Sequence, residues 1–256
     1  MNKENGESNA IGKRGLSGST LKLIAIVTML IDHTAAVILE PLLHYQNGVI
    51  IKDNLYLADQ IMRATGRIAF PIFCFLLVEG FFYTKSRVKY AIRLTVFAII
   101  SEVPFDLAFT KQAFYMSYQN VFFTLLIGLL MMMGIQYGRD HILPRITKGR
   151  NICALLMQTV IFLLAAVLAD VLRTDYGFWG IIAIFVMYIL RFNRLYMCLC
   201  EALYFMSFEA PTVVLSFLPI FFYNGKRGLN LKYIFYVFYP AHLLILSGIY
   251  MLYFIK

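Results

Sequence analysis

The sequence LKLIAIVTMLIDHTAAVILEPLLH, residues 21–44, decides the fold, because it is an apolar run long enough to cross a membrane as a helix. Inside it lies an adjacent pair of titratable residues, Asp32 and His33. Ionisable groups within a membrane span are costly and usually face the protein interior or a water-filled cavity. The pair therefore predicts a functional site within the bilayer.

The composition of the whole chain agrees with this run. Of the 256 residues, 61% are hydrophobic and only 14% are charged, and apolar runs recur along the sequence. The net charge of +9 does not indicate a nucleic-acid partner, because the basic residues lie in short loops between apolar runs and not on one continuous face. We predict an all-α polytopic transmembrane bundle in contact with membrane lipid.

The lengths of the apolar runs, and the polar loops that separate them, predict about nine spans, within a range of eight to ten. They cover residues 20–43, 67–84, 89–109, 120–137, 152–172, 177–190, 195–208, 211–223 and 233–254. Residues 1–19 are polar and rich in Gly and Ser, which predicts a disordered cytoplasmic tail before a single transmembrane domain, residues 20–256. The connection 44–66 leaves room for an amphipathic surface helix.

The loops alternate in basic content, which gives an orientation. In the nine-span arrangement, 17 of the 23 Lys and Arg residues lie on the side of the N-terminus. The positive-inside rule therefore predicts a cytoplasmic N-terminus and an external C-terminus.

Several titratable residues share the predicted interior with the first pair. They are Arg67, Glu79, Glu102, Asp106, Asp170 and His242. These groups cannot all be charged and excluded from water, because an unpaired buried carboxylate takes up a proton instead. We therefore expect a hydrated internal funnel, in which some carboxylates are protonated or bonded to His or Arg.

Glu102 and Asp106 are four residues apart and share one helix face, with Pro104 between them freeing a backbone carbonyl. They form either a polar niche at the site or a pair of structural carboxylates that bond to neighbouring helices. His242, close after Pro240, is either a packing residue or an imidazole that a kink turns toward a cavity.

Polar residues also gather at the outer ends of the fourth, fifth and sixth spans. They are Asn120, Asp170, Asp175 and Tyr176, and we expect them to contact a substrate. Cap and turn chemistry is the alternative explanation for Asn120 and Asp175. Arg67, at the outer boundary of the second span, either joins this group or extends to the interface as basic residues commonly do.

Six stretches of the chain resemble the TraX family of membrane proteins. They are LKLIAIVTMLIDH at 21–33, GRIAFPIFCFLLVEGFFYT at 66–84, RLTVFAIISEVPFDLAF at 93–109, NVFFTLLIGLL at 120–130, DYGFWGI at 175–181 and YPAHLLIL at 239–246. The family is named for a conjugation protein that acetylates the N-terminus of F-type pilin. It is in turn similar to multispan acyltransferases that take acyl groups from a cytoplasmic donor, usually acetyl-CoA.

This resemblance implies an acetyl-CoA-dependent membrane acyltransferase of the bacterial cytoplasmic membrane, with an acceptor at the extracytoplasmic side. A protein N-terminus, a glycan hydroxyl and a lipid headgroup are all possible acceptors. Acyl transfer needs a base and groups that stabilise a developing oxyanion. We expect His33 to be the base, with Asp32, Glu102, Asp106 and Arg67 in the catalytic group. Glu102 would orient the imidazole, or Asp32 would pair with Arg67.

The acyl donor would bind on the cytoplasmic side. We expect its binding group to comprise Lys85, Arg87, Lys89, Arg93, Glu79 and His242, the basic members contacting phosphates. Ordinary positive-inside charge explains the same basic residues. No metal is expected, because the polar residues lack a ligand spacing.

Two other classes of function remain open. A proton-coupled transporter or flippase would use the same acids and histidines as a relay. A noncatalytic pilus or envelope assembly factor would tolerate substitutions at His33, Glu102 and Asp106.

Overall fold

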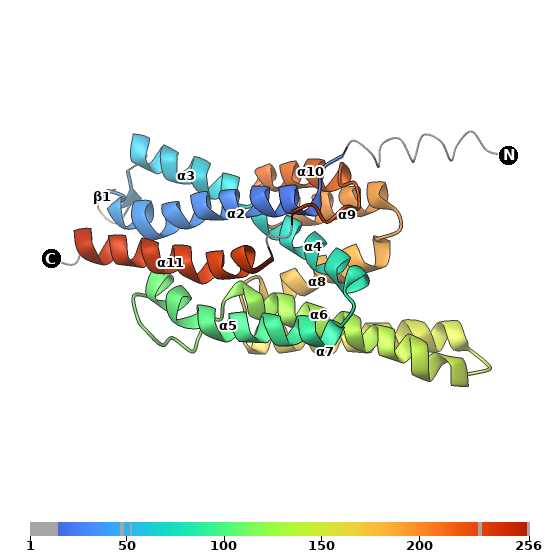
Figure 1. Cartoon of the computed structure of the whole chain (residues 1–256). Coiled ribbons are helices and arrows are strands. Elements are labelled where there is room, and N and C mark those ends of the chain that lie inside the picture. Colours follow the sequence, from blue (N-terminus) through green and yellow to red (C-terminus); the bar gives the residue numbers. More distant parts are fainter. Residues whose placement is uncertain (1–14, 47–48, 52, 230–231, 255–256) are drawn as a thin grey trace.

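The structure, a computed structural model, describes residues 15–46, 49–51, 53–229 and 232–254 as a helical bundle (Figure 1). Helix α2 (Gly18–Thr34) continues through the π-helical turn η1 (Ala35–Leu39) and the 3₁₀ turn η2 (Glu40–Leu42) to a short hairpin, β1 (Tyr45–Gln46) and β2 (Val49–Ile50). The later elements are α3 (Asn54–Gly66), α4 (Ala69–Tyr83), α5 (Arg87–Phe109), α6 (Val121–Tyr137), η3 (Gly138–Ile142), η4 (Leu143–Arg145), α7 (Arg150–Val171), α8 (Gly177–Leu190), α9 (Arg194–Met206), η5 (Pro211–Ser216), α10 (Phe217–Phe221) and α11 (Lys232–Phe254).

Short polar side chains set the starts of five helices. Ser17, Asp53, Ser86, Asn120 and Asn193 accept hydrogen bonds from backbone N–H groups in the first turns of α2, α3, α5, α6 and α9. Such caps satisfy backbone donors that have no partner within the helix. The cap chemistry considered for Asn120 is therefore present in the structure.

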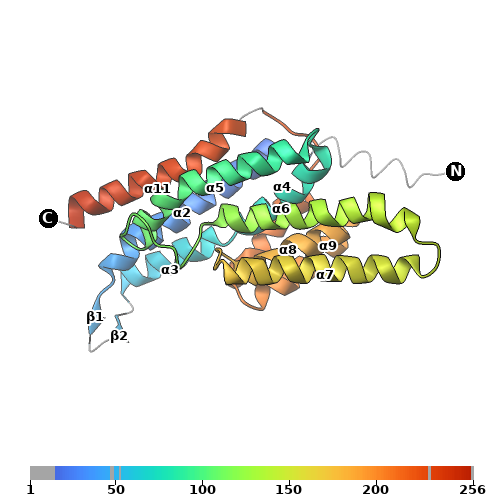
Figure 2. The same ribbon diagram turned by 90° about the horizontal axis from the view of Figure 1, so that it is seen from below.

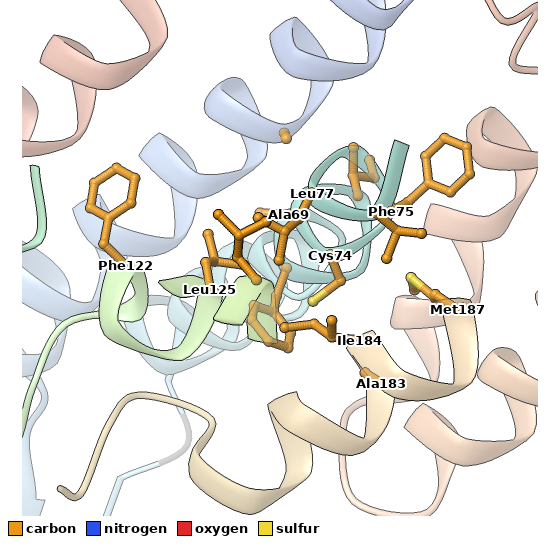
Figure 3. Packing of buried hydrophobic residues seen from close by; sticks show 14 of the residues in the cluster. Ala69, Cys74, Phe75, Leu77, Phe122, Leu125, Ala183, Ile184 and Met187 are labelled. Carbon is orange, nitrogen blue, oxygen red and sulfur yellow. The ribbon is translucent and has the colours of Figure 1, made fainter. Parts of the chain in front are cut away.

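Helix α4 lies at the centre of the bundle and packs against α2, α6, α8 and α10. Figure 3 shows Cys74 and Leu77 of α4 on the side of Leu125 of α6 and Ile184 of α8, whereas Phe75 points to another side of α4. All five of these side chains are buried. A helix that is apolar on every face belongs in such an interior, because each face has a neighbouring helix to cover it.

The other helices form two groups around α4. Helix α11 runs along α5 and also contacts α2, whereas α6, α7 and α8 pack on one another. Figure 2 shows these two groups side by side, with the α6–α7 hairpin extending beyond the rest of the bundle. The outer face of α7 exposes Leu155, Leu156, Leu163, Leu164 and Val167. An exposed face made of several large apolar side chains suits contact with lipid.

Five helical stretches of the described chain are long and apolar enough to cross a membrane: Gly18–Leu42, Asn54–Tyr83, Val121–Arg145, Arg150–Val171 and Tyr233–Tyr253. Each of the nine predicted segments is helical, but α8 has only 14 residues, α9 has 13, and α10 has five. About 20 residues are needed for a complete crossing. The structure therefore supports a helical membrane bundle without confirming nine complete spans.

Two predicted boundaries differ from the structure. The predicted tail lies largely outside the described residues, but its last part is folded, since Leu16 pairs with Tyr223 and Ser17 caps α2. The connection 44–66 contains α3, which leads into α4 with only Arg67 and Ile68 between the two helices. Residues 54–83 therefore form one long stretch, and α3 is part of the bundle.

Candidate functional site

Five charged residues meet where α2, η2, α3 and the loop after α9 come together. Nη1 of Arg63 lies 2.9 Å from Oδ1 of Asp32, and Nε of Arg63 lies 3.1 Å from Oε1 of Glu40. Nε of Arg67 lies 3.1 Å from Oε2 of Glu209. We call these five residues the charge cluster. It contains three carboxylates and two guanidinium groups, so each arginine is neutralised by at least one acid.

A glycine brings the first part of this cluster together. A Cβ atom on Gly66 would lie 2.1 Å from Cβ of Asp32, so only glycine allows α3 to approach α2 this closely. Arg63 lies three residues before Gly66, about one helical turn, and therefore faces the same side of α3. The close approach of α2 and α3 places the Arg63 guanidinium beside Asp32.

Two cavities open beside the charge cluster. The first has a volume of about 380 Å³, and its lining includes Arg67, Asp170, Asp175, Tyr176, Trp179 and Glu209. The second has a volume of about 300 Å³, and its lining includes Glu40, Asp59, Arg63, Arg67, Phe208 and Glu209. Because Arg67 and Glu209 line both cavities, their ion pair lies between the two.

Asp175 is fixed in the first cavity by the connection between α7 and α8. The backbone there pairs with Gln119, and Oδ1 of Asp175 accepts a hydrogen bond of 2.7 Å from the hydroxyl of Tyr118. Burial raises the pKa of Asp175 to about 6, against the opposing effects of that hydrogen bond and of the Arg67 charge. Arg173 and Tyr176 adopt left-handed conformations, with φ of 51° and 63°. Such conformations are costly for residues other than glycine and often occur at functional sites.

His33 forms a pair with His242 of α11. Nδ1 of His33 lies 2.7 Å from Nε2 of His242, and the planes of the two rings differ by 7°. Phe109 of α5 and Tyr239 of α11 contact the His33 ring edge-on, with centroid distances of 5.3 and 6.1 Å. Arg63 is close enough to His33 for an electrostatic interaction. The histidine pair therefore lies beside the charge cluster.

The two carboxylates of α5 have separate partners. Oε2 of Glu102 accepts a hydrogen bond of 2.7 Å from Nδ2 of Asn120, and Oδ2 of Asp106 accepts one of 2.7 Å from the backbone N–H of Tyr115. These bonds tie α5 to the start of α6 and to the loop between them. The structural explanation considered for the two acids therefore fits their contacts.

The residues predicted to bind an acyl donor have separate contacts and do not bond to one another among the described residues. Lys85 and Lys89 are exposed at the turn between α4 and α5. The guanidinium of Arg87 lies 4.0 Å from the centre of the Phe81 ring, and that of Arg93 lies over Tyr90. Glu79 forms an ion pair of 3.0 Å with Arg191 of α8.

Several predicted pairings are corrected by these contacts. Asp32 bonds to Arg63 rather than to Arg67, because Arg63 lies on the face of α3 that Gly66 presses against α2. Glu102 bonds to Asn120, and the partner of His33 is His242. His242 therefore belongs with His33 and not with the basic group near Lys85.

Other functional candidates were missed at the level of sequence. Glu40, Asp59, Arg63, Tyr118 and Glu209 all line the cavities. Asp59 and Arg63 are four residues apart within a segment predicted to be a connection, so their helical spacing was the available signal.

Glu201 was missed as well. Its side chain is fully buried in α9, and neither carboxylate oxygen has a hydrogen-bond partner among the described residues. An acid within an apolar segment was the signal that drew attention to Asp32, and it applies equally to Glu201.

Comparisons with known proteins identify the family of this chain. The TraX protein family matches residues 17–250. The chain is 27% identical, over 268 aligned positions, to the probable fimbrial assembly protein FimC, serogroup H1, of Dichelobacter nodosus, and the alignment covers 91% of this chain and 95% of that relative. No solved structure matches the chain. Since the family match extends over most of the sequence, the chain belongs to the TraX protein family.

Proposed function

We propose that this protein is an integral membrane acyltransferase, specifically an acetyltransferase, in which His33 is the general base. The observation that carries the proposal is the position of His33, which is bonded to His242 and lies within electrostatic reach of Arg63 in the charge cluster. Transfer of an acyl group to a hydroxyl or amine requires removal of a proton from the acceptor. An imidazole is suited to that step near neutral pH.

The acceptor would bind in the first cavity and extend its reacting hydroxyl or amine from there toward His33, which does not itself line that cavity. Asp170, Asp175, Tyr176 and Arg67 offer polar groups there, and Trp179 adds an aromatic surface. A polar acceptor with an exposed hydroxyl or amine fits this lining, whether it belongs to a protein N-terminus, a glycan or a lipid headgroup. Asn120 would act indirectly, since its side chain holds Glu102 and caps α6.

Acetyl-CoA would enter from the opposite end of the bundle. Lys85 and Lys89 are the exposed members of the predicted donor group and would contact the phosphates of the donor. In this arrangement the N-terminus lies in the cytoplasm, and the protein is located in the bacterial cytoplasmic membrane. The thioester would supply the activated acyl group, while the residues of this chain position the acceptor and accept its proton.

A noncatalytic role in fimbrial or pilus assembly is the second candidate. It is favoured by the name of the Dichelobacter nodosus relative, a probable fimbrial assembly protein. Such a factor would act through contacts with other envelope proteins, so substitution of His33 would leave its effect on assembly intact.

The proposal can be tested in cells that produce either the wild-type protein, the His33→Ala variant or neither. Mass spectrometry of envelope proteins, glycans and lipids should reveal an acetylated species that requires the wild-type protein and is lost in His33→Ala. The matched control is His141→Ala, because His141 is exposed and lies in η3, away from the cavities. Equal membrane levels of the variants would exclude a folding defect.

An acetylated species that persists in His33→Ala would overturn the role of His33. The absence of any acetylated species that depends on the wild-type protein, together with lost pilus assembly, would favour the noncatalytic alternative.

A further inference from the structure

The hydrogen bonds of the histidine pair fix the position of each ring proton. Nδ1 of His242 lies 2.7 Å from the backbone carbonyl oxygen of Phe238, one turn earlier on α11. A carbonyl oxygen only accepts hydrogen bonds, so Nδ1 of His242 must carry a proton. If the ring is neutral, its Nε2 has a lone pair and can only accept.

The hydrogen bond between the two rings then determines which nitrogen of His33 carries a proton. Nδ1 of His33 lies 2.7 Å from Nε2 of His242, so in the neutral pair Nδ1 of His33 is the donor. The lone pair of His33 is then on Nε2. In a neutral imidazole, the hydrogen bond at one nitrogen decides which nitrogen is basic.

The surroundings favour the neutral form of both rings. His242 is 4% exposed and is stacked on Phe238, with ring centroids 4.7 Å apart. Charged groups that lose their water in apolar surroundings are strongly penalised unless an opposite charge compensates them. The titratable groups facing His33 are Arg63 from α3 and Tyr239 and His242 from α11. Because Arg63 is already paired with Asp32 and Glu40, the loss of water around the two rings is the main reason for their neutral form.

We propose that His242 is a positioning residue for acyl transfer: held by the Phe238 carbonyl, it accepts the Nδ1 proton of His33 and leaves Nε2 of His33 as the basic nitrogen. This inference rests on the proposed function. As the oxygen or nitrogen of the acceptor forms its bond to the acyl carbon, its proton passes to Nε2 of His33. The carbon–sulfur bond of the thioester donor breaks, and the imidazolium returns the proton to the departing sulfur.

The ring protons can be measured without any enzymatic assay. The chain has four histidines, so ¹⁵N-histidine labelling and solid-state NMR of the protein in lipid, purified without a histidine tag, give few signals. Single His→Gln variants assign each signal. His141 is an internal reference, because its Nδ1 also lies 3.1 Å from a backbone carbonyl, that of Tyr137, on an exposed ring.

At neutral pH we expect both His33 and His242 to be protonated at Nδ1 and unprotonated at Nε2. A proton on Nε2 of His33 with a bare Nδ1 would overturn the assignment. The NMR result does not depend on turnover. If the protein showed no acyl transfer, the proposed function would be refuted, but the tautomers could still be determined.

Kinetics test the consequence of the assignment. A glutamine side chain can place an acceptor oxygen near the position of Nε2, whereas leucine cannot. We expect His242→Leu to lower kcat by about 100- to 1000-fold with little change in KM, and His242→Gln to retain kcat within about tenfold. The pH dependence of kcat should shift in His242→Leu and not in the His141→Gln control. Wild-type kcat and an unchanged pH profile in His242→Leu would overturn the positioning role.

Discussion

Asp32 and His33 are neighbours in sequence but contact different partner residues. Successive residues on an α-helix point about 100° apart, so the two side chains leave α2 in different directions. Asp32 bonds to Arg63 of α3, and His33 bonds to His242 of α11. The unusual placement of this pair in an apolar segment is visible in the sequence. Their partners are not, because they depend on how α3 and α11 are rotated against α2.

The Asp175 carboxyl group gives the folded protein a pH dependence. Its folded-state pKa is raised from 3.8 to about 6, so its contribution to stability is complete below the unfolded pKa and is lost as the pH rises through about 6. Asp175→Asn removes this titration and keeps an oxygen that can accept the Tyr118 hydrogen bond. We expect the stability of the wild type relative to Asp175→Asn to fall between pH 4 and pH 7 by at most ~3 kcal/mol.

Thermal unfolding in detergent at several pH values provides the measurement. Asp53→Asn is a control of opposite sign, because the His44 side chain and the Tyr56 backbone N–H lower the pKa of Asp53 through hydrogen bonds. The stabilisation from Asp53 is present above its unfolded pKa and is lost as the pH falls through the folded value. A wild type that gains stability relative to Asp175→Asn between pH 4 and pH 7 would contradict the buried environment of Asp175.

At the scale of the elements, the contact between α2 and α3 depends on Gly66. A Cβ atom there would lie 2.1 Å from Cβ and 2.4 Å from Cγ of Asp32, and these atoms are too close to the backbone to move aside freely. Gly66→Ala should separate the two helices and weaken the ion pair between Asp32 and Arg63. We expect a loss of about 1–3 kcal/mol in stability, measured as a lower thermal midpoint in detergent.

Gly248→Ala is the matched control in α11. A Cβ atom at Gly248 would have no neighbouring atom within 4 Å in the part of the chain that the structure describes, and alanine is a better helix former than glycine. This variant should keep or raise the thermal midpoint. If Gly66→Ala were as stable as Gly248→Ala, the close approach of α2 and α3 would be wrong.

The helices themselves could largely be predicted from apolar length and caps. The predicted segment 89–109 is α5 (Arg87–Phe109), and 177–190 has the same bounds as α8. The junction of α3 with α4 could not be predicted, because residues 54–66 are polar enough to resemble a surface connection. The ion-pair partner of Glu79 could not be predicted from the sequence either, since Arg191 is distant in sequence and meets Glu79 only through the packing of α4 on α8.

At the scale of the whole molecule, the sequence predicted a helical membrane bundle, and the family match over residues 17–250 confirms the resemblance to TraX proteins. The number of crossings depends on α5, which is long but is not among the five stretches, and on the short helices α8, α9 and α10. The two cavities reproduce only part of the predicted funnel. Arg67 and Asp170 line them, whereas the other members of the predicted set are absent from their linings: Asp32, His33, Glu79, Glu102, Asp106 and His242.

Acyl transfer with His33 as the base is tested most directly by following labelled acetyl groups with the purified protein in liposomes. Labelled acetyl-CoA is supplied at the side of Lys85 and Lys89, and an envelope fraction from cells lacking the protein is supplied as acceptor at the side of Asp175. The wild type should transfer label and release free thiol, and His33→Ala should do so at least ~100-fold more slowly while remaining folded. Transfer by His33→Ala at the wild-type rate would refute the role of His33 as the base, and no transfer by the wild type would refute the acyltransferase activity.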